Sequence, residues 1–153
     1  VAVRVRGPRN GEEASQLAIR VQGSTCEVHA VNRGRFPFTF DKCFDSTGDA
    51  PATQADVFET LGLPLVDNAF AGLNSSVIAY GPTGSGKTYS VFGPERSLGS
   101  ASEGLIPRVC NELFSRIQAA SVSPSGPPTR HVVRVAALEV YLEEVYDLLA
   151  ARR

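Results

Sequence analysis

Apolar and polar residues alternate along the first forty positions in short runs that predict β-strands. The first run, Val1 to Arg6, alternates apolar with basic side chains, which is typical of a strand with one covered face. Two further runs, residues 17–21 and 26–31, are separated by a Gly-Ser turn and predict a small hairpin. Residues 36–40 are aromatic and alternating, and Pro37 places this strand near an edge or an end of a sheet. We therefore expect mainly β-structure here.

The spacing of apolar residues changes to three and four farther along the chain, which predicts helices. This spacing holds from residue 54 to residue 70. Pro64 is expected to divide that helix into two pieces, because an interior proline removes a backbone hydrogen bond and clashes with the preceding turn. Residues 105–117 carry a second helical stripe. Its members are Ile106, Val109, Leu113 and Ile117.

Two short apolar runs predict strands among these helices. They are residues 76–80, which lead into a glycine-rich loop, and residues 132–141, which are rich in β-branched side chains. Residues 143–149 follow and close the chain. Strands that alternate with helices indicate an α/β fold around a mostly parallel sheet.

Composition bounds the kind of protein to which the chain belongs. With 153 residues, 42% of them hydrophobic, it fits one domain or a piece of a larger one. No apolar run approaches the roughly 20 residues of a membrane span, so we expect no membrane anchor. The net charge is −1, which gives no reason to expect bulk electrostatic binding to nucleic acid or to a membrane surface. Any anion site must therefore be local.

The cysteines and the N-terminus add two further expectations. Cys26, Cys43 and Cys110 include no C-x-x-C pair, so neither a disulfide framework nor a zinc cage is predicted, and a reduced, cytoplasmic protein is the natural interpretation. Cys43 and Cys110 have apolar neighbours and are expected in the core. Because the chain begins at Val1 and contains no methionine, we expect a piece of a longer protein.

The strongest chemical signal is an eight-residue match to G-x-x-x-x-G-K-[ST], between an apolar run and a helix start. Glycines let the backbone wrap around phosphate oxygens, so that N–H groups and the helix start point at the anion. Lys87 would reach the β and γ phosphates, and the Thr88 hydroxyl would complete Mg²⁺ coordination. Lysine occurs only at positions 42 and 87. The predicted phosphate-binding residues are Gly81, Pro82, Thr83, Gly84, Ser85, Gly86, Lys87 and Thr88.

The residues around this loop closely resemble the kinesin motor domain. The most characteristic segment is PLVDNAFAGLNSSVIAYGPTGSGKTYSVFG, residues 64–93. Four more segments agree in order, so the resemblance covers essentially the whole chain. They are VAVRVR at the start, FTFDKCF at 38–44, GLIPRV at 104–109 and LEVYLEEVYDLL at 138–149. The fold that the resemblance implies is a P-loop NTPase three-layer sandwich with a mostly parallel central sheet.

Further site residues follow from the resemblance alone. It implies that Arg4, Arg6 and Pro8 lie beside the adenine of ATP or ADP and that Tyr89 stacks near the base. The family has proline directly after the second arginine, whereas Gly7 intervenes here, and Pro82 replaces the family's usual glutamine. The alternatives are an amphipathic edge strand with solvated charges for the two arginines and an ordinary core or surface aromatic for Tyr89.

Two segments that the family uses for hydrolysis are absent from the printed sequence. They are the switch segments N-x-x-S-S-R-S-H and D-L-A-G-S-E, and the microtubule-contacting elements that follow them are absent too. We therefore interpret residues 1–153 as the N-terminal, nucleotide-binding half of a kinesin-like motor domain. We assign no catalytic residue and expect the chain to bind nucleotide better than it hydrolyses it. The resemblance implies a cytoskeletal protein that contacts tubulin through other regions, which also set its oligomeric state.

Two other classes of function stay open. One is a non-motile nucleotide-binding or scaffold protein that retains half of the motor fold. The other is a generic P-loop kinase or GTPase, which would need Glu139 as the acid beside Mg²⁺ and which lacks an N-K-x-D motif here. His29 and His131 show no metal-binding spacing and are expected at the surface or in loops. The acidic residues near the C-terminus are expected to form a solvated face. They are Glu139, Glu143, Glu144 and Asp147.

Overall fold

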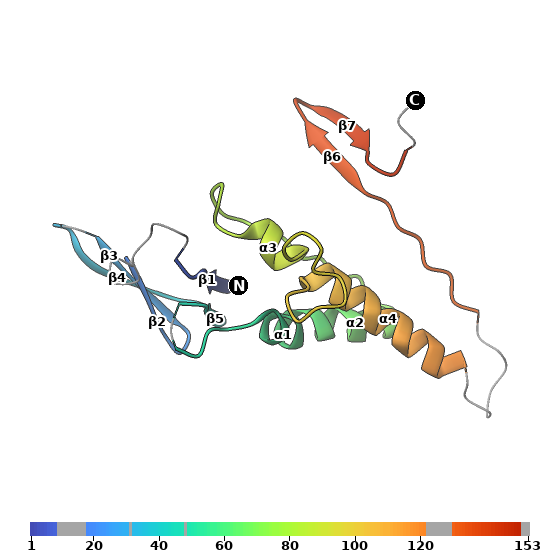
Figure 1. The fold of residues 1–153 in the computed structure, drawn as a ribbon, viewed down its shortest axis with the longest axis horizontal. Helices are drawn as coiled ribbons and strands as arrows, with labels where there is room; N and C mark the ends of the chain where they lie inside the picture. Colours follow the sequence, from blue (N-terminus) through green and yellow to red (C-terminus); the bar gives the residue numbers. More distant parts are fainter. Residues whose placement is uncertain (9–17, 31, 48, 122–129, 151–153) are drawn as a thin grey trace. The chain divides into compact units, whose positions relative to one another are not determined.

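The computed structural model describes residues 1–8, 18–30, 32–47, 49–121 and 130–150. It divides into two units, Val1–Phe114 and Ser115–Arg153. Figure 1 shows the elements of each unit along the chain.

The first strand of the chain pairs with a strand forty residues later. β1 (Ala2–Val5) and β5 (Lys42–Asp45) lie parallel, with Val3 opposite Cys43. This pair confirms the predicted first strand. It also shows the parallel pairing that an α/β fold requires.

The predicted hairpin forms an antiparallel sheet of three strands. β2 (Ile19–Gln22), β3 (Thr25–Ala30) and β4 (Gly34–Thr39) lie in the order β2-β3-β4. Gly23 has a φ of 59°, a left-handed conformation that suits the two-residue turn between β2 and β3. Pro37 lies in β4, at the edge of this sheet as expected.

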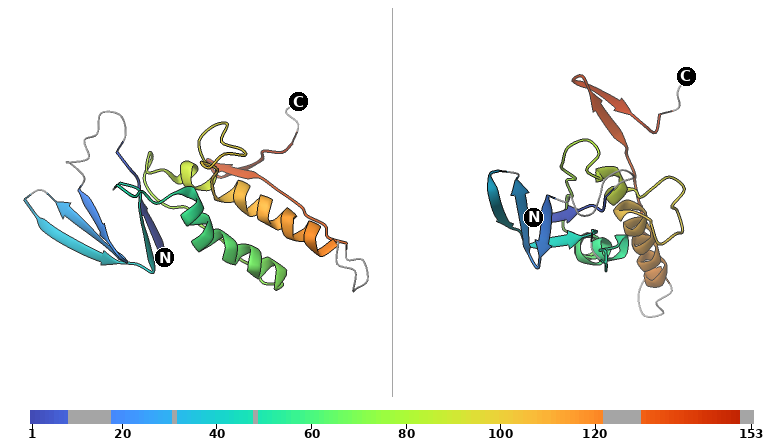
Figure 2. Two further views of the ribbon diagram at one scale, coloured as in Figure 1. Left: turned by 60° about the horizontal axis from the view of Figure 1, so that its bottom comes forward. Right: turned by 60° about the vertical axis from the view of Figure 1, so that its left-hand side comes forward.

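The hydrophobic core of this β-structure lies where the three-stranded sheet meets the parallel pair. Val5, Cys26 and Cys43 are buried there, and partly buried apolar side chains pack around them. Figure 2 shows β1 and β5 beside β2 in both of its views. The packed neighbours are Val3, Ile19, Val21 and Phe40.

The helix predicted for residues 54–70 forms over its full length. It consists of α1 (Gln54–Val57), a π-helical turn, η2 (Phe58–Gly62), and α2 (Leu63–Phe70). Pro64 lies in the first turn of α2, where a proline needs no N–H partner. The helix is therefore divided by a π-helical turn before Pro64, and it is not broken at the proline.

Two more helices follow in the chain. α3 (Lys87–Val91) begins inside the glycine-rich loop, and α4 (Leu105–Ser121) confirms the predicted second helix with four more residues. Cys110 of α4 is exposed, so its predicted place in the core is wrong. It lies off the stripe that carries the less exposed residues Val109, Leu113 and Ile117.

Residues 76–80 do not form the predicted strand. They belong to no helix or strand, pair with none of the described residues, and have exposed side chains. A strand needs a neighbour for its N–H and C=O groups, and apolar patterning cannot show whether that neighbour is present.

The predicted strand at residues 132–141 is also shorter than expected. Only β6 (Leu138–Tyr141) forms, and it pairs with β7 (Glu144–Asp147) in an antiparallel hairpin. Leu142 and Glu143 make the turn with φ values of 49° and 67°. The side chains of both strands are exposed.

Within the described residues, no helix is both long and apolar enough to cross a membrane.

Candidate functional site

The glycine-rich loop has backbone conformations that favour glycine. Gly81 and Gly86 have φ values of 151° and 100°, a region that side-chain-bearing residues rarely adopt. A Cβ atom on Gly81 would lie 2.7 Å from the hydroxyl oxygen of Ser85, so a side chain would also crowd the loop. The N–H of Ser85 donates to the carbonyl oxygen of Pro82 at 3.1 Å and closes a turn.

Lys87 lies against the loop that precedes it. Its Nζ donates to the carbonyl oxygens of Gly81 and Pro82, at 2.8 and 2.9 Å. The ammonium group is therefore held beside the start of the loop by two neutral acceptors. An anion bound in the loop would compete for the same three donors of this group.

Thr88, the predicted Mg²⁺ ligand, is exposed in the first turn of α3. Its carbonyl oxygen accepts the N–H of Phe92 at 2.8 Å, which keeps the backbone in the helix. Among the described residues, no group of three or more His, Cys, Asp or Glu side chains is arranged to hold a metal ion. Any metal here would therefore rely on Thr88 together with oxygens of a bound ligand.

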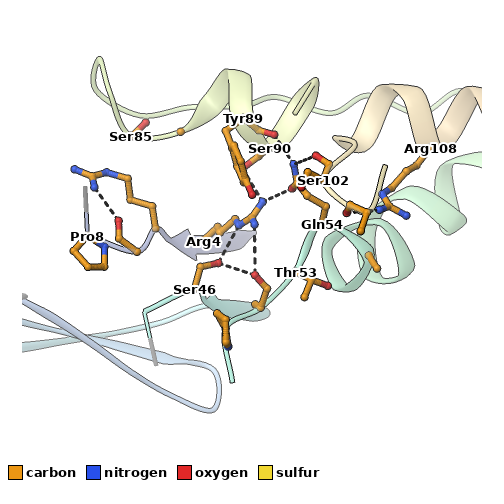
Figure 3. A pocket seen from close by; sticks show the side chains of 17 residues that line it. Arg4, Pro8, Ser46, Thr53, Gln54, Ser85, Tyr89, Ser90, Ser102 and Arg108 are labelled. Carbon is orange, nitrogen blue, oxygen red and sulfur yellow. Dashed lines mark hydrogen bonds between the residues drawn. The ribbon is translucent and has the colours of Figure 1, made fainter. Parts of the chain in front are cut away.

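A cavity of about 820 Å³ lies beside the loop, within the unit Val1–Phe114. Its volume falls in the range of small-molecule and cofactor sites. Figure 3 shows how its walls come from β1, the start of α1, α3 and the segment around Ser102. Six of the predicted site residues line it. They are Arg4, Arg6, Pro8, Ser85, Gly86 and Tyr89.

Arg4 lines the cavity, and four polar contacts hold its side chain in place. Its guanidinium donates to Gln54 Oε1 at 2.6 Å, to the Ser90 and Ser46 hydroxyls at 3.2 and 3.3 Å, and more weakly to the Ala52 carbonyl at 3.5 Å. Burial lowers the pKa of Arg4 from its ordinary value, although nearby Tyr89 and Asp56 act in the opposite direction. The alternative of a solvated charge on an edge strand therefore does not describe Arg4.

The guanidinium of Arg4 also lies over the ring of Tyr89, 5.2 Å from its centroid. Figure 3 shows the two side chains pointing toward each other from β1 and α3. The side chain of Tyr89 is about half exposed, at 45%. Arg4 thus covers part of one face of the Tyr89 ring, and the rest of the ring is open.

Gln54 is a site residue that the sequence did not reveal. It is only 4% exposed. Besides accepting from Arg4, its amide donates to the carbonyl oxygens of Tyr89 and Ser102, at 2.6 and 3.2 Å. One side chain thus connects β1, α1, α3 and the segment before α4. A glutamine at the start of a helix gives no sequence signal for this role, because the role depends on its neighbours in space.

Arg6 and Pro8, the other residues predicted to lie beside the base, follow the C-terminal end of β1. Arg6 Nη1 donates to the carbonyl oxygen of Gly7 at 2.9 Å, and Pro8 is exposed on the cavity wall. A Cβ atom on Gly7 would lie 2.8 Å from the carbonyl oxygen of Ser46. Gly7, which the family pattern does not have at this position, therefore lets the backbone pass close to Ser46, the residue that follows β5.

The segment between α3 and α4 forms the far wall. Glu103 is buried, and its carboxylate accepts the N–H of Gly99 and the side-chain amide of Asn111. Arg108 donates to the carbonyl oxygens of Glu103 and Ala101, at 3.0 and 2.8 Å. These bonds fix the segment that presents Ser102 to the cavity.

Lys87 lines a second, smaller cavity of about 180 Å³ rather than the larger one. Ser85 and Gly86 line both cavities, so the loop lies between them. The other predicted loop residues line neither. They are Gly81, Pro82, Thr83, Gly84 and Thr88.

The two histidines and the acidic residues near the C-terminus were expected to have no catalytic or metal-binding role. His131 is exposed as expected, whereas His29 lies half-buried on β3 rather than at the surface or in a loop, and it contacts the carboxylate of Glu27. The acidic residues near the C-terminus are all exposed, which confirms the predicted solvated face. They are Glu139, Glu143, Glu144 and Asp147.

Several known proteins are similar to this chain over nearly its whole length. The kinesin-like protein K39 of Leishmania chagasi is 41% identical over 160 residues, which cover 100% of this chain and 15% of the relative. Klp-19 of Caenorhabditis elegans is 43% identical and KIN-12B of Arabidopsis thaliana 37% identical, each over 97% of this chain. The chain thus spans only about a tenth to a seventh of the length of these relatives.

Solved structures show the same fold. A KIF14 segment with ADP in complex with a microtubule has a TM-score of 0.77 and 32% identity, over 99% of this chain and 41% of that one. The Drosophila protein Kin10/NOD, at a TM-score of 0.69 and 24% identity, adds support for the fold. The predicted P-loop NTPase fold of a kinesin motor domain is therefore confirmed. The family model of the kinesin motor domain matches residues 4–153, and the chain accordingly belongs to the kinesin motor domain family.

Proposed function

We propose that this chain binds Mg²⁺ with ATP or ADP and supplies the nucleotide-binding half of an ATP-driven microtubule motor. The observation that carries the proposal is the complete phosphate-binding motif beside a cavity of about 820 Å³ whose wall presents Tyr89. The KIF14 structure, a similar motor domain, contains ADP and a microtubule. The kinesin family itself is a family of microtubule motors.

The loop and the cavity would divide the nucleotide between them. Backbone N–H groups of the loop other than Pro82, which has none, and the ammonium of Lys87 suit the phosphates as hydrogen-bond donors, and the glycines at 81, 84 and 86 place no side chain in the way. Arg6, Pro8 and the open part of the Tyr89 ring suit the base. Arg4 would act behind Tyr89, since its guanidinium is already bonded to protein acceptors.

Thr88 is the residue that would hold Mg²⁺, and its exposed hydroxyl fits a hard cation with oxygen ligands. When bound, the ion would neutralise charge on the phosphates. Without a group to orient water, the residues in this chain would bind the phosphates but would not activate an attacking nucleophile.

The length of the match supports the half-domain interpretation. The chain covers 41% of the similar KIF14 structure while 99% of the chain itself is matched. Both switch segments named above are absent from the printed sequence. Stimulation by a filament needs an element whose two states contact the filament differently, and the resemblance places the microtubule-contacting elements after these switch segments.

A phosphate-release assay with and without polymerised tubulin tests this proposal. Residues 1–153, folded and saturated with nucleotide, should show turnover near background in both conditions, whereas the protein at its natural length should be stimulated at least tenfold, about 1.4 kcal/mol of barrier. Stimulation of residues 1–153 alone would contradict the half-domain interpretation. Nucleotide binding without stimulation at the natural length would favour the second candidate, a non-motile nucleotide-binding protein.

A further inference from the structure

Two cysteines from different sheets meet in the core of the β-structure. Cys26 lies on β3 and Cys43 on β5, and their sulfur atoms are 3.4 Å apart. The two residues are 17 positions apart in the sequence. Neither thiol belongs to the nucleotide site, since neither lines either of the two cavities.

Backbone pairing fixes both cysteines in place. Cys26 is opposite Val21 on β2 and Phe38 on β4, and Cys43 is opposite Val3 on β1. Cys26 is 4% exposed and Cys43 is 9% exposed. The thiols therefore face each other because two β-ladders hold them there, and not because a mobile loop brings them together.

We propose that Cys26 and Cys43 form a dithiol site that hydrogen peroxide converts to an intramolecular disulfide between β3 and β5. The sulfur atoms need to approach by about 1.4 Å to reach the length of an S–S bond.

The reaction balances with peroxide as the oxidant. One thiol loses its proton and its sulfur attacks a peroxide oxygen, which breaks the O–O bond, releases one water and leaves a sulfenic acid. The second thiolate then attacks that sulfur, and hydroxide leaves and takes up a proton to form the second water. Two thiols thus lose two electrons and two protons, and one peroxide gains them.

The apolar surroundings make this oxidation slow at neutral pH. Burial, followed by the hydrogen bond with Cys43, raises the pKa of the Cys26 thiol to about 11. Because only the thiolate attacks, the oxidation rate should rise roughly tenfold per pH unit below this value, as long as the fold is retained. Peroxide is small and uncharged, so it suits a site that excludes larger oxidants.

The disulfide would join the three-stranded sheet to the strand that leads into the nucleotide site. Ser46, which follows β5 directly, accepts a hydrogen bond from Arg4. By constraining the unfolded chain, a bridge across 17 positions should raise Tm by about 5–10 °C. Cys110 is exposed on α4 and has no such partner thiol among the described residues, so it provides an internal comparison.

Peptide mapping of the purified protein at its natural length tests the site. After peroxide treatment of a Cys110→Ser variant, followed by alkylation in denaturant and digestion with trypsin, peptide 21–33 should be linked to peptide 43–87. The linked pair should be two hydrogen masses lighter than the separate peptides, and dithiothreitol should release it. A Tm measured before and after dithiothreitol should fall on reduction by the amount given above.

Three results would overturn the proposal. One is recovery of both peptides in separate alkylated form after treatment long enough to oxidise exposed Cys110 in the unsubstituted protein. Another is linkage of Cys26 or Cys43 only between molecules, and the third is conversion of each thiol to a sulfinic acid without linkage. These measurements use only the Cys110→Ser variant, which changes an exposed residue. They therefore do not require a protein with a substitution in its core to fold.

Discussion

The wall around Arg4 and the phosphate-binding loop are held in different ways. Arg4, Gln54 and Tyr89 are joined by side-chain hydrogen bonds and a cation–π contact that come from three elements. The loop is closed by one backbone turn and by Lys87, and it follows residues 76–80, which pair with none of the described residues. We therefore expect substitutions in the wall to cost stability as well as affinity, and removal of the Lys87 ammonium from the loop to cost affinity alone.

The largest effect is expected from Lys87→Ala. Removing the ammonium should weaken Mg·ATP at least 100-fold, because charge-assisted bonds to the β and γ phosphates contribute roughly 3 kcal/mol together. Tm should stay within about 2 °C of the unsubstituted chain, since Lys87 bonds only the loop's own carbonyl groups among its described partners. Calorimetric titration and thermal unfolding measure the two quantities.

Lys42→Ala is the matched control for this change. Lys42 is the other lysine of the chain, lies exposed on β5, and lines neither cavity. Its removal should leave the affinity for Mg·ATP unchanged within about twofold. Equal losses in the two variants would mean that Lys87 acts through net charge rather than through phosphate contact.

Gln54→Leu should be the most costly change in the wall. It keeps the size of the side chain but leaves Arg4 without its closest acceptor and two carbonyl oxygens without their shared donor. Leaving buried polar groups unsatisfied should lower the free energy of unfolding by roughly 1–3 kcal/mol and weaken Mg·ADP as well. Urea unfolding monitored by circular dichroism measures the first effect.

Gln22→Leu serves as the comparison, because Gln22 is an exposed glutamine at the end of β2. Its unfolding free energy should change by less than about 0.5 kcal/mol. If both glutamine variants are equally stable, the hydrogen bonds of Gln54 do not hold the wall together.

Tyr89→Ala should weaken Mg·ATP by roughly 5- to 20-fold, near the lower end of a base-stacking contribution, because Arg4 already covers part of the ring. Tyr89→Phe keeps the ring and should bind nearly as well as the unsubstituted chain. A loss of equal size in Tyr89→Phe would place the contribution at the hydroxyl group and not at the ring.

The smallest effect is expected at the start of α1. The Thr53 hydroxyl accepts the N–H of Asp56, and the Asp56 carboxylate accepts the N–H of Thr53, which together form a capping box. Thr53→Ala should cost roughly 1 kcal/mol of stability, and Thr53→Ser should retain most of it. Equal stability of the alanine and serine variants at pH 7 would contradict the capping role.

The same cap gives a pH dependence with a definite sign. Hydrogen bonds from Thr53 lower the pKa of Asp56 from its ordinary value. Because the folded state favours the ionised carboxylate, the stabilisation is present above the pKa of the unfolded chain and is lost as the pH falls through the lowered pKa. A carboxyl titration followed by NMR should therefore show a higher pKa for Asp56 in Thr53→Ala.

Local patterns were enough to predict much of the β-structure and of the helices. Alternation identified β1 and the β2–β3 hairpin, and the spacing of apolar residues identified α4. The loop was predicted from its motif, because glycine positions and one lysine are visible in the sequence itself. These features depend on residues close together in the chain.

The features that the sequence missed depend on neighbours in space. Residues 76–80 have the composition of a strand, but strand formation also needs a paired neighbour. Gln54 and the facing thiols of Cys26 and Cys43 gain their significance from elements that pack around them. Cys110 is exposed because it lies one position away from the covered stripe of α4, a difference too small for apolar context to resolve.

The central claim is that the phosphate-binding loop and the wall around Arg4 contact different parts of the nucleotide. The most direct test is to titrate one variant from each with two ligands. Lys87→Ala and Tyr89→Ala would each be titrated with Mg·ATP and with Mg·triphosphate, which lacks the base. We predict that Lys87→Ala loses affinity for both ligands, whereas Tyr89→Ala loses affinity for Mg·ATP by roughly 5- to 20-fold and keeps its affinity for Mg·triphosphate within about twofold. Parallel losses for both ligands in Tyr89→Ala, or an unchanged triphosphate affinity in Lys87→Ala, would contradict it.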